Sequence, residues 1–327
     1  MMSRLSSFIL GFAAVALLVA PADAYASTAK KHHKAKHAVA TTTKHHKAKR
    51  NLALNQGLRG GHVTRVSAAS SSLEPSLYSS AALVVNEQSG EHIFEKNSQN
   101  VTPIASVTKL MTAMVTLDMH LSLDEPITIT DDDIDRLKNS SSRLLVGTTL
   151  TRGEVMHLAL MASENRAAHA LARTAPGGIE AFIARMNRTA QSLGMTHTRF
   201  EDPTGLTSAN VSTAEDLVRM VEAAHHYKEI RAYSTSEEYA FLSNVNGREY
   251  AFHNTNPLVK SDTWDIGLSK TGYISEAGKC LVMQATIDST PVVIVLLDSA
   301  GKLTRIGDAN RIKRWLETSP AAKLRAG

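Results

Sequence analysis

The sequence predicts an α+β domain over residues 73–327, on two observations. Runs typical of β-strands occur at both ends of this region, and apolar residues at helical spacing fill the part between them. Strands and helices that are segregated along a chain indicate an α+β fold. We expect a single antiparallel sheet, in which the first hairpin and the last strands meet across an inserted helical segment.

The domain is predicted to open with a β-hairpin and to continue with helices. Apolar residues at 81–85 and 92–94 flank a polar Gln-Ser-Gly turn at 88–90. Apolar residues that follow Ser106 recur at helical spacing as far as Leu117, which predicts the first helix. Further helices are predicted at 154–161, 166–173, 179–193 and 214–224.

Strand character returns in the C-terminal third of the chain. Residues 239–242 and 249–252 surround an Asn-Gly turn at 246–247, which is a strong signal for a second hairpin. Cys280 is the only cysteine of the chain and begins an apolar run, so we interpret it as a buried structural thiol. The last strands are predicted at 266–271, 280–287 and 292–297, and a closing helix is predicted at 305–316.

Residues 1–26 have the features of a secretory signal. Arg4 gives a basic start, residues 8–20 are apolar, and small residues at 22–26 offer a cleavage site. The apolar run is shorter than the roughly 20 residues that a membrane-spanning helix needs, so cleavage is favoured over a membrane anchor. We therefore expect a periplasmic protein, with no transmembrane or lipid anchor in the mature chain.

Residues 27–72 form a basic segment rich in His and Lys. Residues 28–65 hold 10 Lys/Arg and no acid, whereas the chain after 65 holds 25 Lys/Arg and 30 Asp/Glu. Such a segment has too little apolar surface to offset its ordering entropy, so we expect a flexible, solvated linker. The alternative is electrostatic attachment to an anionic polymer of the cell envelope. The folded domain is expected to span 73–327.

Several functional classes are disfavoured by what the sequence lacks. The basic residues of the tail are not interleaved with aromatics, so no nucleic-acid partner is predicted. The histidines at 197, 225, 226 and 253 show no zinc spacing, and no phosphate loop or dinucleotide-binding motif occurs. We therefore predict neither a metal nor a cofactor. The acidic run at 131–135 lacks the Gly and Glu of a calcium loop and is interpreted as a solvated turn and helix start.

Three short motifs carry the predicted chemistry. They are Ser-x-x-Lys at 106–109, Ser-Glu-Asn at 163–165 and Lys-Thr-Gly at 270–272. Each alone occurs often by chance, but here the first begins an apolar helix, the second lies between two helices and the third ends a strand. We therefore interpret the three motifs as parts of one catalytic site, with Ser106 as its nucleophile.

The chemistry of this site follows from the residue types. A serine hydroxyl is a weak nucleophile unless a base takes its proton, and the i, i+3 spacing brings the Lys109 amine to Ser106. Lys109 acts as a base only when it is neutral part of the time, which desolvation and a neighbouring cation such as Lys270 both favour. The backbone N–H groups of Ser106 and Tyr273 are predicted to stabilise the developing oxyanion.

The other motif residues are expected to move protons and bind substrate. Ser163 can relay a proton to the leaving amine, and Asn165 can orient a substrate amide or Lys109. Lys270 and Thr271 can hold a substrate carboxylate by charge and by hydroxyl. The predicted catalytic residues are thus Ser106, Lys109 and Ser163, and the predicted substrate-binding residues are Asn165, Lys270, Thr271, Gly272 and Tyr273.

With these motifs the chain resembles the D-alanyl-D-alanine carboxypeptidases and endopeptidases, the low-molecular-mass penicillin-binding proteins of serine peptidase family S11. Residues 105–113, 161–168 and 270–273 are close to family sequence, and 265–268, 270–278 and 296–302 look most like its endopeptidase branch. The resemblance implies a β-lactamase-like transpeptidase fold. It also implies peptidoglycan stem peptides and crosslinks as substrates, an acyl-enzyme on Ser106, and β-lactam antibiotics as covalent inhibitors.

The resemblance has two departures. Only 55 residues follow Gly272, so we expect the C-terminal β-rich domain and membrane helix of typical family carboxypeptidases to be absent. No Glu-x-x-Leu-Asn segment supplies the deacylating base of class A β-lactamases. A DD-endopeptidase that cuts D-Ala-to-diaminopimelate crosslinks is the leading hypothesis, and a carboxypeptidase that trims terminal D-Ala is the alternative. A β-lactamase and a non-catalytic peptidoglycan-binding module are the competing classes.

Overall fold

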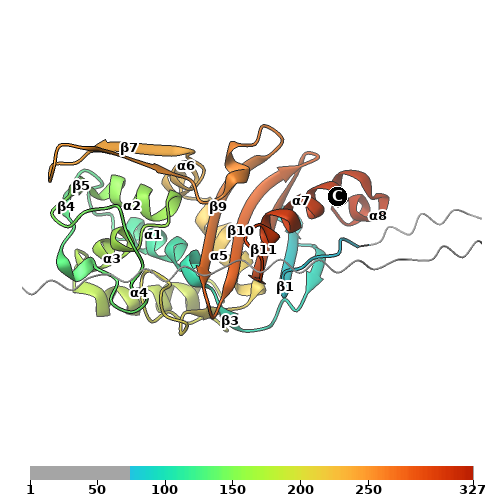
Figure 1. Ribbon diagram of the computed structural model, residues 1–327. Coiled ribbons are helices and arrows are strands. Elements are labelled where there is room, and N and C mark those ends of the chain that lie inside the picture. The colour runs from blue at the N-terminus through green and yellow to red at the C-terminus, as the bar shows by residue number, and fades with distance from the viewer. Residues whose placement is uncertain (1–73, 327) are drawn as a thin grey trace, which may run out of the picture. The chain divides into compact units, whose positions relative to one another are not determined.

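A five-stranded antiparallel sheet organises the fold (Figure 1). Its strands are β1 (Ala81–Asn86), β2 (His92–Lys96), β9 (Asp265–Ile274), β10 (Gly278–Ile287) and β11 (Thr290–Ser299). The computed structural model describes residues 74–326, so the predicted secretory signal and linker lie outside the described residues. The strand order is β2-β1-β11-β10-β9. Because β1 pairs with β11, the first hairpin and the last strands meet across the helical insertion, which confirms the predicted arrangement.

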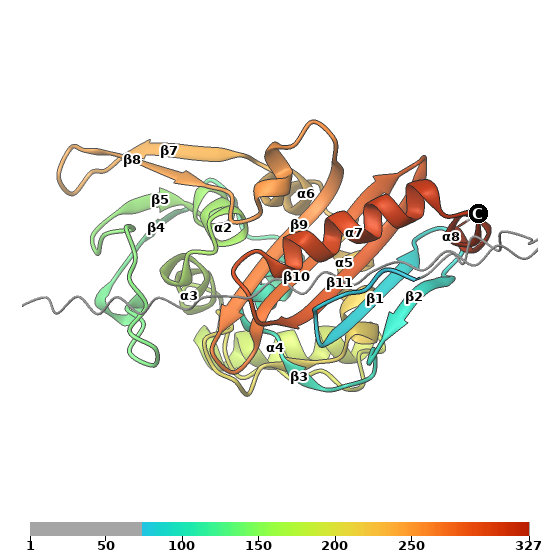
Figure 2. The same ribbon diagram turned by 45° about the vertical axis from the view of Figure 1, so that its right-hand side comes forward.

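Helices cover both faces of this sheet (Figure 2). On one face lie α7 (Thr304–Thr318) and α8 (Pro320–Ala326), and on the other lies α5 (Ala214–His225). Successive residues of a strand point to opposite faces, so Val84 joins the apolar cluster around Trp315, while Leu83 joins the cluster around Leu217. Burial on both faces explains why β1 is a continuous apolar run rather than an alternating one.

A helical region is inserted between β2 and β9. Its helices are α1 (Thr108–Asp118), α2 (Arg152–Met161), α3 (Asn165–Arg173), α4 (Gly178–Ser192) and α6 (Lys228–Ser234). The predicted helices are confirmed with ends that differ by a few residues, because apolar periodicity is a strong signal in helices of this length. Helices α6 and α8 were not predicted, because they have 7 residues each and are too short to show a clear period.

Short elements hold the connecting loops in place. Strand β3 (Thr102–Pro103) pairs with β6 (Val211–Ser212), and β4 (Pro126–Thr128) pairs with β5 (Thr149–Thr151). None of these four was predicted, because two or three residues carry no periodic signal. The predicted second hairpin is confirmed as β7 (Glu238–Leu242) and β8 (Glu249–His253), and the short 3-10 helices are η1 (Ala105–Val107), η2 (Asp131–Asp133) and η3 (Pro257–Lys260).

The interpretation of the acidic run at 131–135 as a solvated turn was wrong at its centre. Asp133 is fully buried, its Oδ1 lies 2.7 Å from His169 Nδ1, and Arg173 Nη2 donates to its Oδ2 at 2.8 Å. The Asp133 carboxylate is therefore paired with two side chains of α3, a contact that composition alone could not reveal. The interpretation of Cys280 is confirmed, since it is buried in β10 and burial raises the pKa of its thiol to about 11.

Within residues 74–326, none of the helices combines the length and apolar character that crossing a bilayer requires.

Candidate active site

Ser106 lies in the short 3-10 helix η1, which runs directly into α1. Ala105, the residue before it, has a φ of 48°, a conformation that costs free energy for a residue with a side chain. Gly205 packs on this turn with a φ of 83°, and a Cβ at this position would overlap the Ala105 carbonyl oxygen and approach Ser106 N. The conformation of the Ser106 turn therefore depends on a close backbone approach that only glycine permits.

The Lys109 amine is buried beside the Ser106 hydroxyl. Only 1% of Lys109 is exposed, and its Nζ lies 2.8 Å from Ser106 Oγ. The same Nζ donates to Asn165 Oδ1 and to the Thr204 carbonyl oxygen, each at 2.7 Å. The expected i, i+3 contact is therefore present, and two further oxygen atoms, one from the start of α3 and one from the loop at 202–206, lie next to the amine.

A chain of hydrogen bonds fixes which end of the Asn165 amide faces Lys109. Ser140 Oγ donates to Asp135 Oδ2 at 2.6 Å, because the carboxylate can only accept. Ser140 Oγ in turn accepts from Asn165 Nδ2 at 2.9 Å, which directs Asn165 Oδ1 toward Lys109. Asn165 Oδ1 and the Thr204 carbonyl oxygen accept the two hydrogens of a neutral Lys109 amine, so its lone pair faces the Ser106 hydroxyl.

Burial allows the Lys109 amine to be neutral near physiological pH. It lowers the pKa of Lys109 to about 7, against the opposing effect of the carboxylates of Asp202, Glu164 and Asp135. Burial also lowers the pKa of Lys270 well below its usual range, and the charges of Lys109 and Arg305 lower it further. Both lysines therefore lose their protons far more easily than an exposed lysine.

Lys270 contacts the second motif rather than the open cleft. Its Nζ donates to Ser163 Oγ and to the Thr271 carbonyl oxygen, each at 2.9 Å, and 1% of the residue is exposed. Ser163 lies in the turn between α2 and α3 with a φ of 60°, which is a second strained non-glycine conformation at this site. Lys270 thus reaches the cleft through the Ser163 hydroxyl.

Strand β9 lies at the sheet edge and supplies the third motif. It continues to Ile274, past the strand end that the sequence analysis expected. Ser269 N–H points off the sheet, toward Ser234 Oγ at 3.3 Å. The pairing with β10 is regular from Ser269 to Tyr273, so Tyr273 N–H also points away from β10. A Cβ at Gly272 would lie 3.1 Å from Ser106 N, which brings both predicted oxyanion donors to one place.

The cleft in front of Ser106 has a volume of about 400 Å³. Arg305 and Thr255 are part of its lining, and sequence analysis missed both. Arg305 lies in the first turn of α7, and its Nη1 donates to the Gly272 carbonyl oxygen at 3.0 Å. Thr271 Oγ1 donates to Thr255 Oγ1 at 2.6 Å. The residues that line the cleft are Ser106, Ser163, Asn165, Thr255, Thr271, Gly272, Tyr273 and Arg305.

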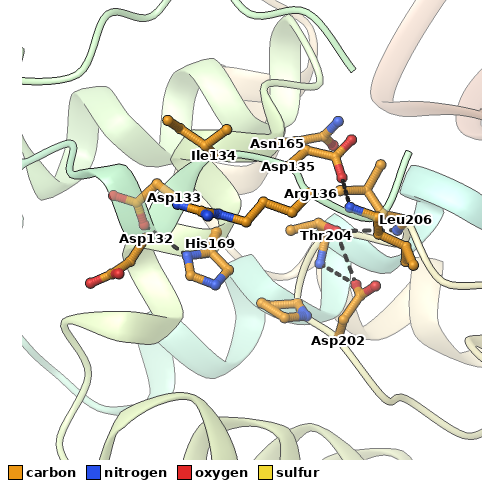
Figure 3. A pocket seen from close by; sticks show the side chains of 12 residues that line it. Asp132, Asp133, Ile134, Asp135, Arg136, Asn165, His169, Asp202, Thr204 and Leu206 are labelled. Carbon is orange, nitrogen blue, oxygen red and sulfur yellow. Dashed lines mark hydrogen bonds and ion pairs between the residues drawn. The ribbon is translucent and has the colours of Figure 1, made fainter. Parts of the chain in front are cut away.

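All of the residues predicted for the site are therefore brought together, with Lys109 and Lys270 buried behind the surface of the cleft. A second hollow of about 210 Å³ shares Asn165 with the cleft (Figure 3). Its walls are the loops at 132–137 and 202–206, and the apolar side chains of Ile134 and Leu206 line it. The surface available to a bound chain therefore continues past Asn165 on the side of α3.

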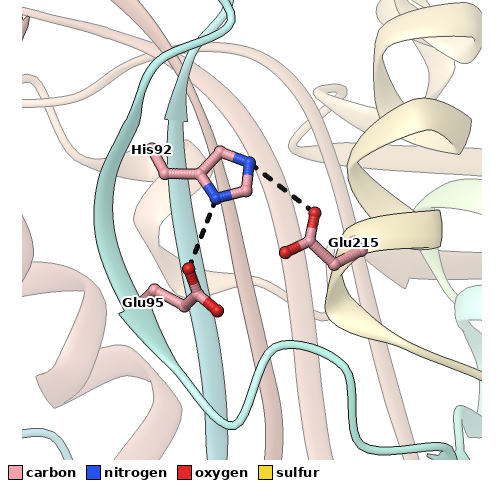
Figure 4. Close-up of side chains that lie close together, drawn as sticks. All are labelled: His92, Glu95 and Glu215. Atoms are coloured by element: carbon pink, nitrogen blue, oxygen red, sulfur yellow. Dashed lines mark hydrogen bonds and ion pairs between the residues drawn. The ribbon is translucent and has the colours of Figure 1, made fainter.

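A separate cluster of His92, Glu95 and Glu215 lies where β2 meets the start of α5 (Figure 4). Ligand atoms of the three residues lie within 4.8 Å of one another, a separation that a metal ion could bridge. His92 Nδ1 lies 3.4 Å from Glu95 Oε2, and His92 Nε2 lies 3.6 Å from Glu215 Oε2. Both ring nitrogens already face a carboxylate, and none of the three residues lines the cleft. We assign this cluster no part in the chemistry at Ser106.

The chain is similar to known D-alanyl-D-alanine peptidases. Residues 62–301 match the family of D-alanyl-D-alanine carboxypeptidases. The chain is 44% identical over 254 residues to a D-alanyl-D-alanine endopeptidase of Pseudomonas aeruginosa, a match that covers 78% of this chain and 82% of the relative. It is 43% identical over 268 residues to a D-alanyl-D-alanine endopeptidase of Escherichia coli, with 80% and 86% covered.

The fold also matches solved structures. The crystal structure of the DD-transpeptidase of Streptomyces K15 superposes with a TM-score of 0.68 at 28% sequence identity. The match covers 74% of this chain and 98% of that one. The predicted β-lactamase-like transpeptidase fold is therefore confirmed.

We predict that Gly205→Ala slows acylation of Ser106 by a labelled penicillin at least tenfold, because the added Cβ displaces the Ala105 carbonyl and the Ser106 turn. Gly194→Ala is the matched control, since Gly194 has a φ of 72° with nothing within 4 Å of the new Cβ. Both variants place an alanine at a positive φ, so the control also carries backbone strain. Equal acylation rates in the two variants, measured by intact mass against time, would contradict the role given to Gly205.

We also predict that the acylation rate of the wild-type protein rises with pH through about 7, because Lys109 must lose its proton to act as a base. Lys109→Ala should slow acylation by a factor on the order of 10² or more and remove this pH dependence. Stopped-flow acylation between pH 5.5 and 9 measures both. A variant that keeps the inflection near pH 7 would place the base elsewhere.

Proposed function

The chain belongs to the D-alanyl-D-alanine carboxypeptidase family, serine peptidase family S11, and we propose that it is a DD-endopeptidase that hydrolyses D-alanyl crosslinks of peptidoglycan. The observation that carries the chemistry is the contact between the buried Lys109 amine and the Ser106 hydroxyl. The endopeptidase assignment is supported by the relatives that are 44% and 43% identical, both of which are D-alanyl-D-alanine endopeptidases.

The first half of the reaction forms an acyl-enzyme. Ser106 Oγ attacks the D-Ala carbonyl carbon while its proton passes to the lone pair of Lys109. The negative charge that develops on the carbonyl oxygen is stabilised by the N–H groups of Ser106 and Tyr273. The C–N bond then breaks, and Ser163 gives its proton to the leaving nitrogen while Lys270 replaces that proton.

This route leaves the total charge of the buried lysine pair unchanged. Lys109 is neutral and Lys270 is protonated before acylation, and the two states are exchanged afterwards. The pair therefore carries one positive charge throughout. A constant charge matters here because both amines are almost fully buried, where adding a second positive charge is costly. Ser163 serves as the link from Lys270 to the leaving nitrogen, at 2.9 Å from Lys270 Nζ.

Hydrolysis of the acyl-enzyme uses the same base. Glu164 is the acid of the second motif, but its Oε2 accepts a hydrogen bond from Ser142 Oγ at 2.7 Å, and Glu164 does not line the cleft. We therefore assign deacylation to Lys109 and Ser106. Once the leaving peptide has departed, Lys109 gives its extra proton to solvent and Lys270 takes one up, which restores the neutral Lys109 amine. A water then attacks the ester carbon, its proton goes to Lys109, and Lys109 passes that proton to Ser106 Oγ as the ester C–O bond breaks. Glu164 holds the loop at 140–144 next to Asn165.

The carboxylate beside the scissile bond binds Arg305 and Thr271. This carboxylate was expected to bind Lys270 and Thr271, but the Lys270 amine is hydrogen-bonded to Ser163 while Arg305 lines the cleft. A guanidinium binds a carboxylate through two parallel hydrogen bonds, which suits a fixed substrate orientation. Lys270 then acts on the substrate by its charge and through Ser163, and Asn165 orients the acyl donor as well as Lys109.

Carboxypeptidase activity is the alternative, because it needs the same acyl group and the same nucleophile. The match to the carboxypeptidase family supports it, whereas the two similar endopeptidases support crosslink cleavage. β-Lactam antibiotics should acylate Ser106 in either case, because they present a strained amide in place of the D-Ala peptide bond. If the protein neither reacted with penicillin nor cleaved either substrate, a non-catalytic peptidoglycan-binding module would be the remaining interpretation.

The location and the tail complete the proposal. We infer that residues 1–26 direct export to the periplasm, where peptidoglycan is accessible, and that residues 27–72 join the catalytic domain as a solvated basic linker. Electrostatic contact of this linker with the anionic cell envelope is the alternative role. Both segments lie outside the described residues, so these statements are supported by the sequence alone.

We predict that residues 66–327 release peptide monomers from purified crosslinked dimers faster than they release D-Ala from pentapeptide monomers. Both substrates are given side by side, and chromatography resolves the products. Ser106→Ala is the control, because it removes one hydroxyl and should abolish both activities. Rapid release of D-Ala while dimers persist would overturn the endopeptidase proposal in favour of the carboxypeptidase.

A further inference from the structure

Three basic residues lie together at one side of the cleft, and their role is not explained by the catalytic steps above. We propose that Lys279 and Lys302, beside Arg305, form a basic site for the second peptide of a crosslink. The site would bind carboxylates on the leaving peptide and so favour crosslinks over terminal D-Ala. This inference rests on the proposed DD-peptidase function and names the group that selects its substrate.

Lys279 is placed next to the catalytic strand by the pairing of β9 with β10. It lies directly opposite Tyr273, and its Nζ is 3.6 Å from the centroid of the Tyr273 ring. Tyr273 lines the cleft immediately after Gly272, and 58% of it is exposed. The ammonium of Lys279 therefore contacts a side chain that lines the cleft.

Lys302 and Arg305 come from the other side of the same surface, the connection from β11 into α7. Arg305 lines the cleft, and Lys302 is exposed in the turn that precedes the helix. Burial lowers the pKa of Lys279, and the positive charges of Arg305 and Lys302 lower it further. Lys279 lies opposite Ser299 in the pairing of β10 with β11, three residues before Lys302, so this pairing brings Lys279 to the start of the connection that carries Lys302 and Arg305.

The charge of this group is not neutralised by the surrounding protein. Among residues 74–326, none of the three cations has a carboxylate oxygen within 4 Å. Glu276, the acid of the same hairpin, is paired instead with Lys138. Asp298, another acid near this hairpin, lies against Gly278. The Nε atom of Arg305 is buried without a hydrogen-bond partner.

The chemistry of the two substrates shows what an additional cation could select. In both, the residue whose nitrogen leaves carries a carboxylate next to the scissile bond, which Arg305 and Thr271 can bind. A terminal D-Ala has no further charged group. The second peptide of a crosslink keeps at least its own C-terminal carboxylate, farther along the leaving side. Only the crosslink can therefore use a cation that lies beyond Arg305.

The test combines lysine variants with a change in the substrate. The variants are Lys279→Met, Lys302→Met and the double variant. Lys260→Met is the matched control, because Lys260 is exposed and does not line the cleft. The substrates are a crosslinked dimer, the same dimer with the C-terminal carboxylate of its second peptide converted to an amide, and a pentapeptide monomer.

At low ionic strength we expect each lysine variant to lower kcat/KM for the acidic dimer about two- to fivefold, the range of a single exposed charge pair, and the double variant about tenfold. Cleavage of the amidated dimer, D-Ala release and penicillin acylation should stay at the wild-type rates. The losses should shrink as salt is added, because exposed charges are screened. Lys260→Met should cleave all three substrates like the wild type.

Two results would overturn the inference in different ways. If the double variant cleaves the acidic dimer at the wild-type rate, or loses the same factor on the amidated dimer, the basic site does not recognise that carboxylate, although the endopeptidase proposal stands. If the wild-type protein releases D-Ala but leaves both dimers intact, the endopeptidase proposal and the basic site fall together.

Discussion

The burial of the Lys109 amine against the Ser106 hydroxyl is the constraint on which the rest of the site depends. An exposed lysine is a cation at neutral pH and cannot take a proton from serine. Burial favours the neutral amine, and fixed oxygens of Asn165 and Thr204 then determine where its lone pair points. The hydrogen bonds from Asp135 through Ser140 hold Asn165 in the required orientation. The orientation of one amine thus depends on atoms from the start of α3 and from two separate loops.

The fold brings these atoms together by closing its sheet across the helical insertion. Lys270 and Ser163 are 107 residues apart in the chain, and they meet because β9 runs along the sheet edge beside the turn between α2 and α3. Positive φ angles at Ala105 and Ser163 show that the site keeps strained backbone conformations at the two serines. The packing that holds them includes Gly205 on one side and Gly272 on the other. Positioning of the catalytic groups therefore costs local stability, which the two apolar clusters on the faces of the sheet can offset.

Much of the fold and the three motifs could be predicted from the sequence, because periodicity and motif spacing are local signals. The helix that carries Lys109 and the strand that carries Lys270 were both predicted in this way. Residues whose role depends on tertiary contacts could not be found. Thr204 contributes only a backbone carbonyl, Asp135 lay in a run interpreted as solvated, and Arg305 looked like any basic residue at a helix start. The hydrogen bond from Lys270 to Ser163 could not be predicted either, because it depends on how the turn between α2 and α3 packs beside β9.

The most direct test is a measurement of the Lys109 pKa itself. Protein labelled with ¹³C at the lysine ε-carbon can be titrated by NMR, with the Lys109 resonance assigned by its loss in Lys109→Arg. The account predicts a resonance that titrates near pH 7, as burial of the amine requires, while exposed lysines titrate above pH 10. A Lys109 resonance whose chemical shift does not change up to pH 10 would show that the amine stays protonated, and would contradict a neutral lysine as the base that activates Ser106.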